Sequence, residues 1–375
     1  APTDVPADPP AQTPPPATCP SGDAFTTLAG KIVVPVSLDG DTSHEFILDT
    51  GAPSSVIDTS LGDKYGTKPV EVKVGGVTQK ITFEVLSLSN GLGSGVVGII
   101  GQDVFGTVLT IDYPRSRFWI EDKLREDALL ACAHVRGAPA VADAKIEDYI
   151  YVRGSLEASA GWFLVDSGAT YGATRKSVFA ALAAAHPRPT LSGFYTPASA
   201  GTFWADVATM GAFEVDALAV TGILTRTIDD DLLPPPKSIG TDTLLGVLPS
   251  GFLHHFMVTI DFGQNKLRLD AKKDDALAEA PGMFVTGISL EETMSSPVHV
   301  TGVLPGSAAA DAGIAAGDEI ATIEGKAIGD IDAFTRPFRL ASPQNGATVH
   351  VEILKAGASA PTAYTLDTRD LLKAP

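Results

Sequence analysis

The fold is decided by the stretch Phe46-Ile47-Leu48-Asp49-Thr50-Gly51-Ala52. A second stretch of the same pattern, Phe163-Leu164-Val165-Asp166-Ser167-Gly168-Ala169, follows 117 residues later. Each is an apolar run that ends at a carboxylate, a small hydroxyl residue and a glycine. A carboxylate at the end of a buried strand is costly unless it is paired, hydrogen-bonded or protonated. The two copies therefore indicate one site, in which Asp49 and Asp166 share a proton.

The composition is that of an ordered globular protein. The chain has 375 residues, of which 44% are hydrophobic and 19% charged, enough for two or three domains with separate cores. Its formal net charge of −18 argues against nucleic acid or an anionic membrane as a partner, because both would repel it. No apolar run reaches the length of a membrane span, about 18 residues. Short runs of Val, Ile and Leu between turn residues predict a β-rich fold.

The N-terminal segment, residues 1–22, is dominated by Pro, Ala and Thr, which predicts a disordered leader. The chain begins at Ala1, as a mature exported protein does after its signal peptide is removed, so we expect a periplasmic or secreted protein; a trimmed chain would begin in the same way. In an oxidising compartment Cys19 and Cys132 would pair and pin the leader to the end of the first unit. The alternative is two unpaired thiols.

The region after each motif is laid out in the same order, which predicts an internal duplication. In the first copy the motif is followed by Ile99-Ile100-Gly101 and by a hairpin over residues 108–120. In the second copy Leu244-Leu245-Gly246 and a hairpin over residues 256–269 take these places. The glycine follows the aspartate by 52 residues in the first copy and by 80 in the second. We assign much of the extra length to a predicted hairpin at Phe194–Trp204.

These landmarks resemble the aspartic peptidases. The two Asp-Thr/Ser-Gly-Ala motifs are similar to the family's active-site loops, and the two apolar-apolar-glycine segments are similar to those that thread behind each loop. Alanine after each glycine resembles the retropepsin branch, whereas two unequal copies in one chain resemble the pepsin plan. The resemblance extends over residues 28–270. It implies a mainly β, bilobal fold with duplicated β-barrel lobes at residues 23–133 and 134–271.

The C-terminal part, residues 280–370, is similar to a PDZ domain and is expected to form a small α+β module. Leu304–Ala309 and Ala312–Ile320 resemble that family's turn, helix and loop, and Val349–Leu354 resembles its late strand. Pro337 departs from the family pattern, and we expect it to shorten the second helix of the module. The resemblance implies a C-terminal peptide as a ligand.

The chemistry expected of the aspartate pair agrees with the resemblance. Two carboxylates held close together cannot both ionise cheaply, so one keeps a proton while the other acts as a base. The base activates a water that attacks a peptide carbonyl, and the protonated partner donates to the oxygen that becomes charged. We therefore expect an aspartic endopeptidase with catalytic Asp49 and Asp166, which needs no metal ion or cofactor. The residues expected to support the two loops are Thr50, Gly51, Ser167 and Gly168.

The alanines after the two motif glycines predict the pH range in which the protein is active. Pepsin-like loops have Ser or Thr at this place, whose hydroxyl stabilises the ionised carboxylate. Ala52 and Ala169 lack that hydroxyl. We therefore expect less depressed pKa values for the pair and activity at mildly acidic to neutral pH.

The substrate is expected to be an extended protein or peptide segment, bound as an added strand and covered by a hairpin. The candidate flap residues are Gly75 and Gly76 in the first copy and Tyr195 and Trp204 in the second, with the second slightly favoured. His254-His255 is interpreted as a surface or core pair, because no further metal ligands are spaced nearby.

An alternative reading assigns the aspartates to ordinary strand ends, and the duplication then reports only a repeated fold. In that case the chain is an inactive peptide-binding or scaffold protein that uses its cleft and its PDZ-like module.

Overall fold

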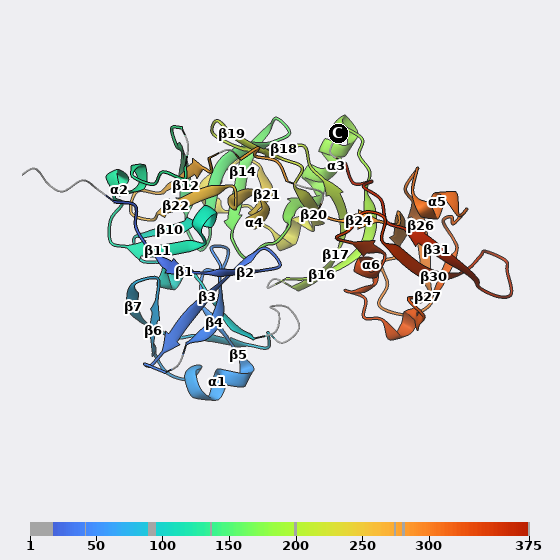
Figure 1. Ribbon diagram of the computed structural model, residues 1–375, viewed down its shortest axis with the longest axis horizontal. Coiled ribbons are helices and arrows are strands. Elements are labelled where there is room, and N and C mark those ends of the chain that lie inside the picture. Colours follow the sequence, from blue (N-terminus) through green and yellow to red (C-terminus); the bar gives the residue numbers. More distant parts are fainter. Residues whose placement is uncertain are drawn as a thin grey trace, which may run out of the picture.

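The computed structural model describes residues 18–41, 43–88, 95–135, 137–198, 201–273, 275–279 and 282–373. Most of the predicted leader, residues 1–17, lies outside the described residues. The described chain is mainly β with short helices, as the sequence predicts (Figure 1). Within these ranges no helix is long and apolar enough to cross a membrane.

The N-terminal lobe is built from short strands and two short helices. In chain order they are β1 (Asp23–Ala24), β2 (Thr26–Leu28), β3 (Lys31–Leu38), β4 (His44–Leu48), β5 (Val56–Asp58), α1 (Thr59–Tyr65), β6 (Val70–Val74), β7 (Val77–Ile81), β8 (Glu84–Leu86), β9 (Val96–Ile100), β10 (Val108–Asp112), β11 (Arg117–Glu121) and α2 (Glu126–Leu130). Strand β6 shows the period-two pattern on which the β prediction rests, with its three valines buried and its two charged residues exposed.

The C-terminal lobe is likewise built from strands and two helices, and several of its strands are longer. Its elements are β12 (Ala140–Ile146), β13 (Ile150–Leu156), β14 (Ser159–Asp166), β15 (Gly172–Arg175), α3 (Lys176–Ala185), β16 (Leu191–Ala198), β17 (Gly201–Thr209), β18 (Ala212–Val215), β19 (Leu218–Thr221), β20 (Leu224–Ile228), β21 (Leu244–Pro249), α4 (Ser250–Leu253), β22 (Phe256–Asp261) and β23 (Lys266–Ala271). The predicted hairpin at Phe194–Trp204 is the tip region of the longer β16–β17 hairpin.

The C-terminal module has a separate core, centred on residues such as Val298, Ile320 and Val351. Its elements are β24 (Phe284–Val285), β25 (Ile288–Leu290), β26 (Val298–Val303), α5 (Ala308–Asp311), β27 (Glu319–Ile323), β28 (Lys326–Ala327), α6 (Arg336–Arg339), β29 (Ala341–Ser342), β30 (Thr348–Leu354) and β31 (Thr362–Asp367). Helix α6 is only four residues long and carries Pro337 in its first turn, which confirms the predicted shortening.

Both lobes use one arrangement of strands around the motif. The strand that leads into the motif, β4 or β14, pairs in parallel with β9 or β21. That partner pairs antiparallel with the strand after the motif, β5 or β15. The strand after the motif in turn pairs in parallel with β8 or β20. The same order of parallel and antiparallel pairs in two places shows that the chain repeats one structural unit.

The strand register corrects one landmark of the sequence comparison. Gly98 pairs with β4 three residues before Asp49, and Gly246 pairs with β14 three residues before Asp166. Gly246 is therefore the counterpart of Gly98. The match of Gly246 to Gly101 that the sequence predicts is wrong by three residues.

The requirement for glycine at both positions is steric. A Cβ on Gly98 would lie 2.5 Å from the carbonyl oxygen of Val56, and one on Gly246 would lie 1.9 Å from that of Ala173. No side chain fits at these distances. Strands β9 and β21 can therefore approach their antiparallel neighbours, β5 and β15, this closely only because the residue at each contact is glycine. The first copy has a second glycine three residues further on, and the local pattern alone does not distinguish the two.

The lobes are joined by a sheet to which each contributes three strands, in the order β1-β11-β10-β22-β23-β12. At its centre β10 and β22 pair antiparallel, with Thr110 opposite Thr259. The hydroxyl oxygens of these two threonines lie 3.1 Å apart. The central pair thus places corresponding threonines of β10 and β22 against each other.

A disulfide between Cys19 and Cys132 ties the segment before β1 to the residues after α2. Cys132 is buried beside Trp119, Leu129 and Met257. The bond spans 113 residues of sequence. Closing a loop of this length removes unfolded-state entropy equivalent to about 4–5 kcal/mol in the chain-entropy model.

Candidate active site

The two aspartates stand at the ends of strands that run through the core of their lobes. Asp49 directly follows β4, whose last three residues are buried, and its N–H donates to the Ile100 carbonyl oxygen at 3.0 Å. Asp166 is the last residue of β14, whose five preceding residues are buried. Both aspartates keep partial solvent access. The carboxyl groups therefore stand where each strand leaves the core.

Thr50 and Ser167 interlock the two motif loops. The Thr50 N–H donates to Ser167 Oγ at 3.0 Å, and the Ser167 N–H donates to Thr50 Oγ1 at 3.0 Å. The Thr50 hydroxyl donates to the Val165 carbonyl oxygen at 3.0 Å, and the Ser167 hydroxyl donates to that of Leu48 at 2.8 Å. Both hydroxyl residues are fully buried. Four reciprocal hydrogen bonds thus hold the loops in one relative position.

Backbone N–H groups and the opposite carboxyl group surround each aspartate. Gly51 N–H donates to Asp49 Oδ1 at 2.7 Å. Gly168 N–H and Ala169 N–H both donate to Asp166 Oδ1 at 2.8 Å. A hydrogen bond also joins the side chains of Asp49 and Asp166. The structure therefore brings together every residue that the sequence analysis assigned to the catalytic pair and its loops.

The two motif glycines are required because each lies against the opposite carboxyl group. A Cβ on Gly51 would lie 2.5 Å from Asp166 Cγ. A Cβ on Gly168 would lie 2.4 Å from Asp49 Oδ2. Any side chain at either position would push the two carboxyl groups apart.

The pKa values of the two aspartates are raised, chiefly by burial. Burial raises the pKa of Asp49 well above its usual range, and the charge of Asp166 raises it further. Burial also raises the pKa of Asp166, but the hydrogen bonds from Asp49, Ala169 and Gly168 oppose that effect. The raised pKa values keep one proton on the pair, and that proton belongs to the two carboxyl groups together.

Two cations near the pair were not found by sequence reasoning. Lys31, at the start of β3, lies near both aspartates and lowers their pKa values, while burial lowers its own pKa. Arg226 in β20 lies near Asp166, and its guanidinium carbon is 5.6 Å from the centre of the Tyr171 ring. Neither residue is close to a motif in sequence, so no local pattern could have identified it.

The first flap candidate is corrected by the structure. Gly75 and Gly76 form the tight turn between β6 and β7, with φ angles of 60° and 86°. The Gly75 carbonyl oxygen accepts from Ile120 N–H at 3.0 Å, and a Cβ on Gly75 would lie 2.8 Å from the Phe118 ring. The turn therefore packs on β11 of the joining sheet and does not cover the aspartates. The sequence signal identified a glycine turn but not the direction in which its hairpin points.

The second candidate is a long hairpin that borders the site. Tyr195 and Trp204 face each other across β16 and β17, with ring centres 4.9 Å apart. Val207 of β17 pairs with Arg226, the residue near Asp166. The hairpin is thus an extension of the sheet edge beside the second aspartate.

The C-terminal module packs against the root of this hairpin. Strand β16 lies beside β25, and Ser192 N–H donates to Ser289 Oγ at 3.2 Å. The Phe194 ring meets the Phe338 ring of α6 edge-on, with ring centres 5.5 Å apart. Leu372, near the end of the chain, is buried in the same apolar cluster. The module is therefore fastened to the C-terminal lobe at its start, at its centre and at its end.

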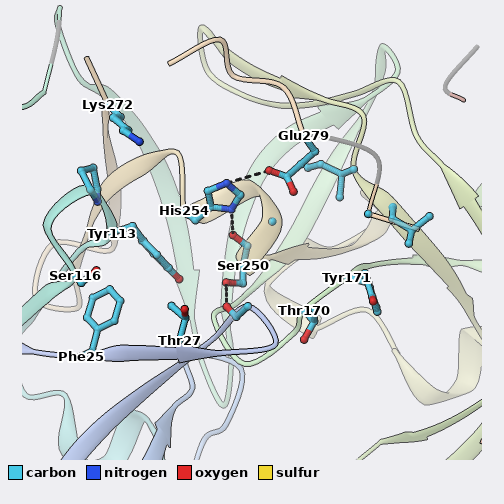
Figure 2. A pocket seen from close by; sticks show the side chains of 16 residues that line it. Phe25, Thr27, Tyr113, Ser116, Thr170, Tyr171, Ser250, His254, Lys272 and Glu279 are labelled. Atoms are coloured by element: carbon cyan, nitrogen blue, oxygen red, sulfur yellow. Dashed lines mark hydrogen bonds and ion pairs between the residues drawn. The ribbon is translucent and has the colours of Figure 1, made fainter. Parts of the chain in front are cut away.

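A recess of about 420 Å³ lies beside the second motif loop (Figure 2). Its lining includes Thr170 and Tyr171, which follow the motif, and Tyr113, which lies near both aspartates. Burial raises the pKa of Tyr113. His254 and Glu279 form another part of the wall, and neither aspartate lines the recess.

Comparisons with known proteins bear on the C-terminal module. No curated protein matches the chain. One similar solved structure is a photosystem II D1 C-terminal processing protease, with 24% identity over 26% of this chain and a TM-score of 0.23; the chain spans 25% of that protein's length. Residues 278–354 match the family model of the PDZ domain. The C-terminal module is therefore a PDZ domain, as its sequence predicts.

Proposed function

We propose that the chain is an aspartic endopeptidase in which Asp49 and Asp166 activate a water between them. The observation that carries this proposal is the hydrogen-bonded pair of carboxyl groups, held by loops that Thr50 and Ser167 interlock. Two ordinary strand-end aspartates would gain nothing from a position in which each one's charge opposes the other's ionisation. Pairs of carboxyl groups with raised pKa values are a common feature of catalytic sites.

The proposed mechanism divides the two roles by their surroundings. The Asp166 carboxylate accepts two backbone hydrogen bonds and acts as the base that takes a proton from the water. The water attacks the peptide carbonyl carbon, and Asp49 donates its proton to the carbonyl oxygen. Asp166 then gives its proton to the amide nitrogen, and a hydroxyl of the tetrahedral intermediate returns a proton to Asp49. The peptide C–N bond breaks, and the pair again holds one proton. All of these steps use carboxyl groups and water alone.

The β16–β17 hairpin is the proposed cover for an extended peptide substrate. The hairpin extends the sheet beside β20, whose Arg226 lies near Asp166. Its paired aromatic residues, Tyr195 and Trp204, offer apolar contact area. An extended segment bound beside it would gain main-chain hydrogen bonds as an added strand.

The PDZ domain is proposed to regulate this hairpin. PDZ domains bind peptides as an added strand at an exposed sheet edge, and β25 is the edge strand of the domain's larger sheet. Here β16 lies beside β25, and Phe194 contacts α6 through Phe338. A peptide that enters the PDZ domain along β25 would therefore compete with the hairpin root. Peptide binding along β25 would therefore affect the hairpin, and substrate binding under the hairpin would affect peptide binding at the PDZ domain.

Export is also part of the proposal. Disulfides persist mainly in oxidising compartments, and the Cys19–Cys132 bond supports a periplasmic or secreted location.

The proposal is tested by cleavage of an unfolded protein substrate by the full chain, with and without pepstatin. Asp49→Asn and Asp166→Asn are expected to abolish cleavage, whereas Asp143→Asn, at an exposed aspartate paired with Lys266, is expected to keep it. Cleavage that persists in both the Asp49→Asn and the Asp166→Asn variants would refute the mechanism.

A peptide-binding protein without catalytic activity is the second candidate, favoured by the PDZ match. It predicts peptide binding by the wild type without cleavage at any pH.

A further inference from the structure

Two histidines and a glutamate converge at the wall of the recess. His254 and His255 follow α4, and Glu279 lies in the segment that leads to the PDZ domain. His254 Nε2 lies 3.0 Å from Glu279 Oε1, and His255 Nε2 lies 3.1 Å from the same oxygen. The two imidazole rings are stacked, with ring centres 4.2 Å apart. Figure 2 shows His254 between Glu279 and Ser250.

The other nitrogen of each ring faces a group that can only accept a hydrogen bond. His255 Nδ1 lies 2.9 Å from Asp275 Oδ1. His254 Nδ1 lies 3.2 Å from the Ser250 carbonyl oxygen. A carboxylate and a carbonyl oxygen have no proton to give, so each Nδ1 must carry the hydrogen. A neutral ring protonated at Nδ1 has a lone pair at Nε2.

Three potential ligand atoms therefore converge on one point. The Nε2 atoms of both rings approach a single Glu279 oxygen, while the Nδ1 atoms face acceptors on their other side. His255 is buried, with 3% of its surface exposed, so its ring is held in this position. Two imidazole nitrogens and a carboxylate oxygen gathered in this way can all serve as ligands of one cation.

We propose that His254, His255 and Glu279 form a binding site for a divalent transition metal ion of the Zn²⁺ type. Two imidazole nitrogens and one carboxylate oxygen are a common ligand set for zinc with one position left open. Asp275 and the Ser250 carbonyl are the kind of outer partners that fix the tautomer and orientation of ligating histidines. The open position faces the recess, since His254 and Glu279 line it.

The site differs from the other cluster of metal-ligating residue types in the described chain. Cys19, Cys132 and His134 also lie together, but both cysteines are joined in a disulfide and offer no thiolate. No ligand partner lies near His254-His255 in sequence, so the sequence alone predicts a surface or core pair. Glu279, 24 residues after His255, is the partner that the fold supplies.

The ion would tie the segment before the PDZ domain to the C-terminal lobe. That segment is already attached by backbone hydrogen bonds from Thr221 N–H to Leu277 O and from Glu279 N–H to Thr221 O. Metal binding would add to these bonds, and the free energy of unfolding would rise with the logarithm of the ion concentration once that concentration exceeds the Kd. This role is independent of the aspartate pair.

The test uses the full chain after treatment with a chelator. Titration with Co²⁺ is expected to give one equivalent bound, with visible absorption typical of nitrogen and oxygen ligands, and Zn²⁺ is expected to displace it and raise the melting temperature. Glu279→Gln, which keeps the side-chain shape, is expected to weaken Zn²⁺ binding by more than about tenfold, and Asp275→Asn by about tenfold.

The matched control is His299→Gln in the PDZ domain, where one histidine pairs with Glu291 at 2.7 Å without a second ring. It is expected to leave Zn²⁺ affinity unchanged. If a variant fails to fold, the Co²⁺ spectrum and stoichiometry of the wild type still decide the matter. Absence of Co²⁺ and Zn²⁺ binding by the wild type, or unchanged affinity in Glu279→Gln, would overturn the proposal.

Discussion

Thr50 and Ser167 each donate a backbone hydrogen bond to the other's side-chain oxygen, both at 3.0 Å, across the boundary between the two lobes. The two residues are 117 positions apart and fully buried. The contact therefore couples the position of each aspartate to the fold of the opposite lobe.

Replacing Thr50 by Val is expected to destabilise the protein by about 2–4 kcal/mol. The substitution keeps the shape but removes the hydroxyl, which leaves the Ser167 N–H and the Val165 carbonyl buried without their partner, at about 1–3 kcal/mol each. Urea unfolding measures the change. Thr348→Val, at an exposed strand position, is the control. Equal stability of the two variants would show that the interlock does not stabilise the fold.

Asp49→Asn is expected to raise the melting temperature at neutral pH. The pKa of Asp49 is raised in the folded state, so its contribution to stability is fully present below the unfolded pKa of about 4 and is lost as pH rises through the folded value. Relative to the wild type, the variant should therefore gain stability with rising pH and show no gain near pH 3. Calorimetry from acidic to neutral pH measures this, and a pH-independent difference would contradict the assignment.

The site was partly predictable from sequence, because duplication makes two distant motifs equivalent. Strands place both aspartates at the ends of corresponding elements, and local alternation identifies strands such as β6. The failures concern contacts between distant segments. Gly101 was taken for Gly98 because both are glycines after apolar runs, and only strand pairing separates them. The direction of the Gly75 turn and the approach of Lys31 to the aspartates depend on tertiary packing, which leaves no periodic signal.

Ala169→Ser is expected to move the activity profile toward acid. Ala169 N–H already donates to the Asp166 carboxylate at 2.8 Å, so a hydroxyl on the same residue is well placed to donate a further bond and lower the pKa of the pair. The pH dependence of peptide cleavage by the wild type and the variant measures the shift. A wild-type profile that peaks only at strongly acidic pH would contradict the role given to Ala52 and Ala169.

Reduction of the Cys19–Cys132 disulfide is expected to lower stability by about 4–5 kcal/mol, because the bond closes a loop of 113 residues. Unfolding of the wild type with and without a reductant measures this loss. The double variant Cys19→Ser/Cys132→Ser should match the reduced wild type and should not respond to the reductant. A response of the double variant would show that the reductant acts elsewhere.

Phe338→Ala is expected to release the root of the β16–β17 hairpin from the PDZ domain. The Phe338 ring meets Phe194 edge-on at 5.5 Å, so truncation removes an aromatic contact worth about 0.5–1.5 kcal/mol beyond its buried area. Amide hydrogen exchange should rise in β16 and β17, and the KM for peptide cleavage should change more than kcat.

The control for this variant is Tyr364→Ala, which packs on the separate core of the PDZ domain. It should leave exchange in the hairpin unchanged. A peptide that binds along β25 should reproduce the effect of Phe338→Ala in the wild type, because it competes for the strand edge beside which β16 lies. Unchanged amide hydrogen exchange in the β16–β17 hairpin of Phe338→Ala would show that the PDZ domain does not control the site.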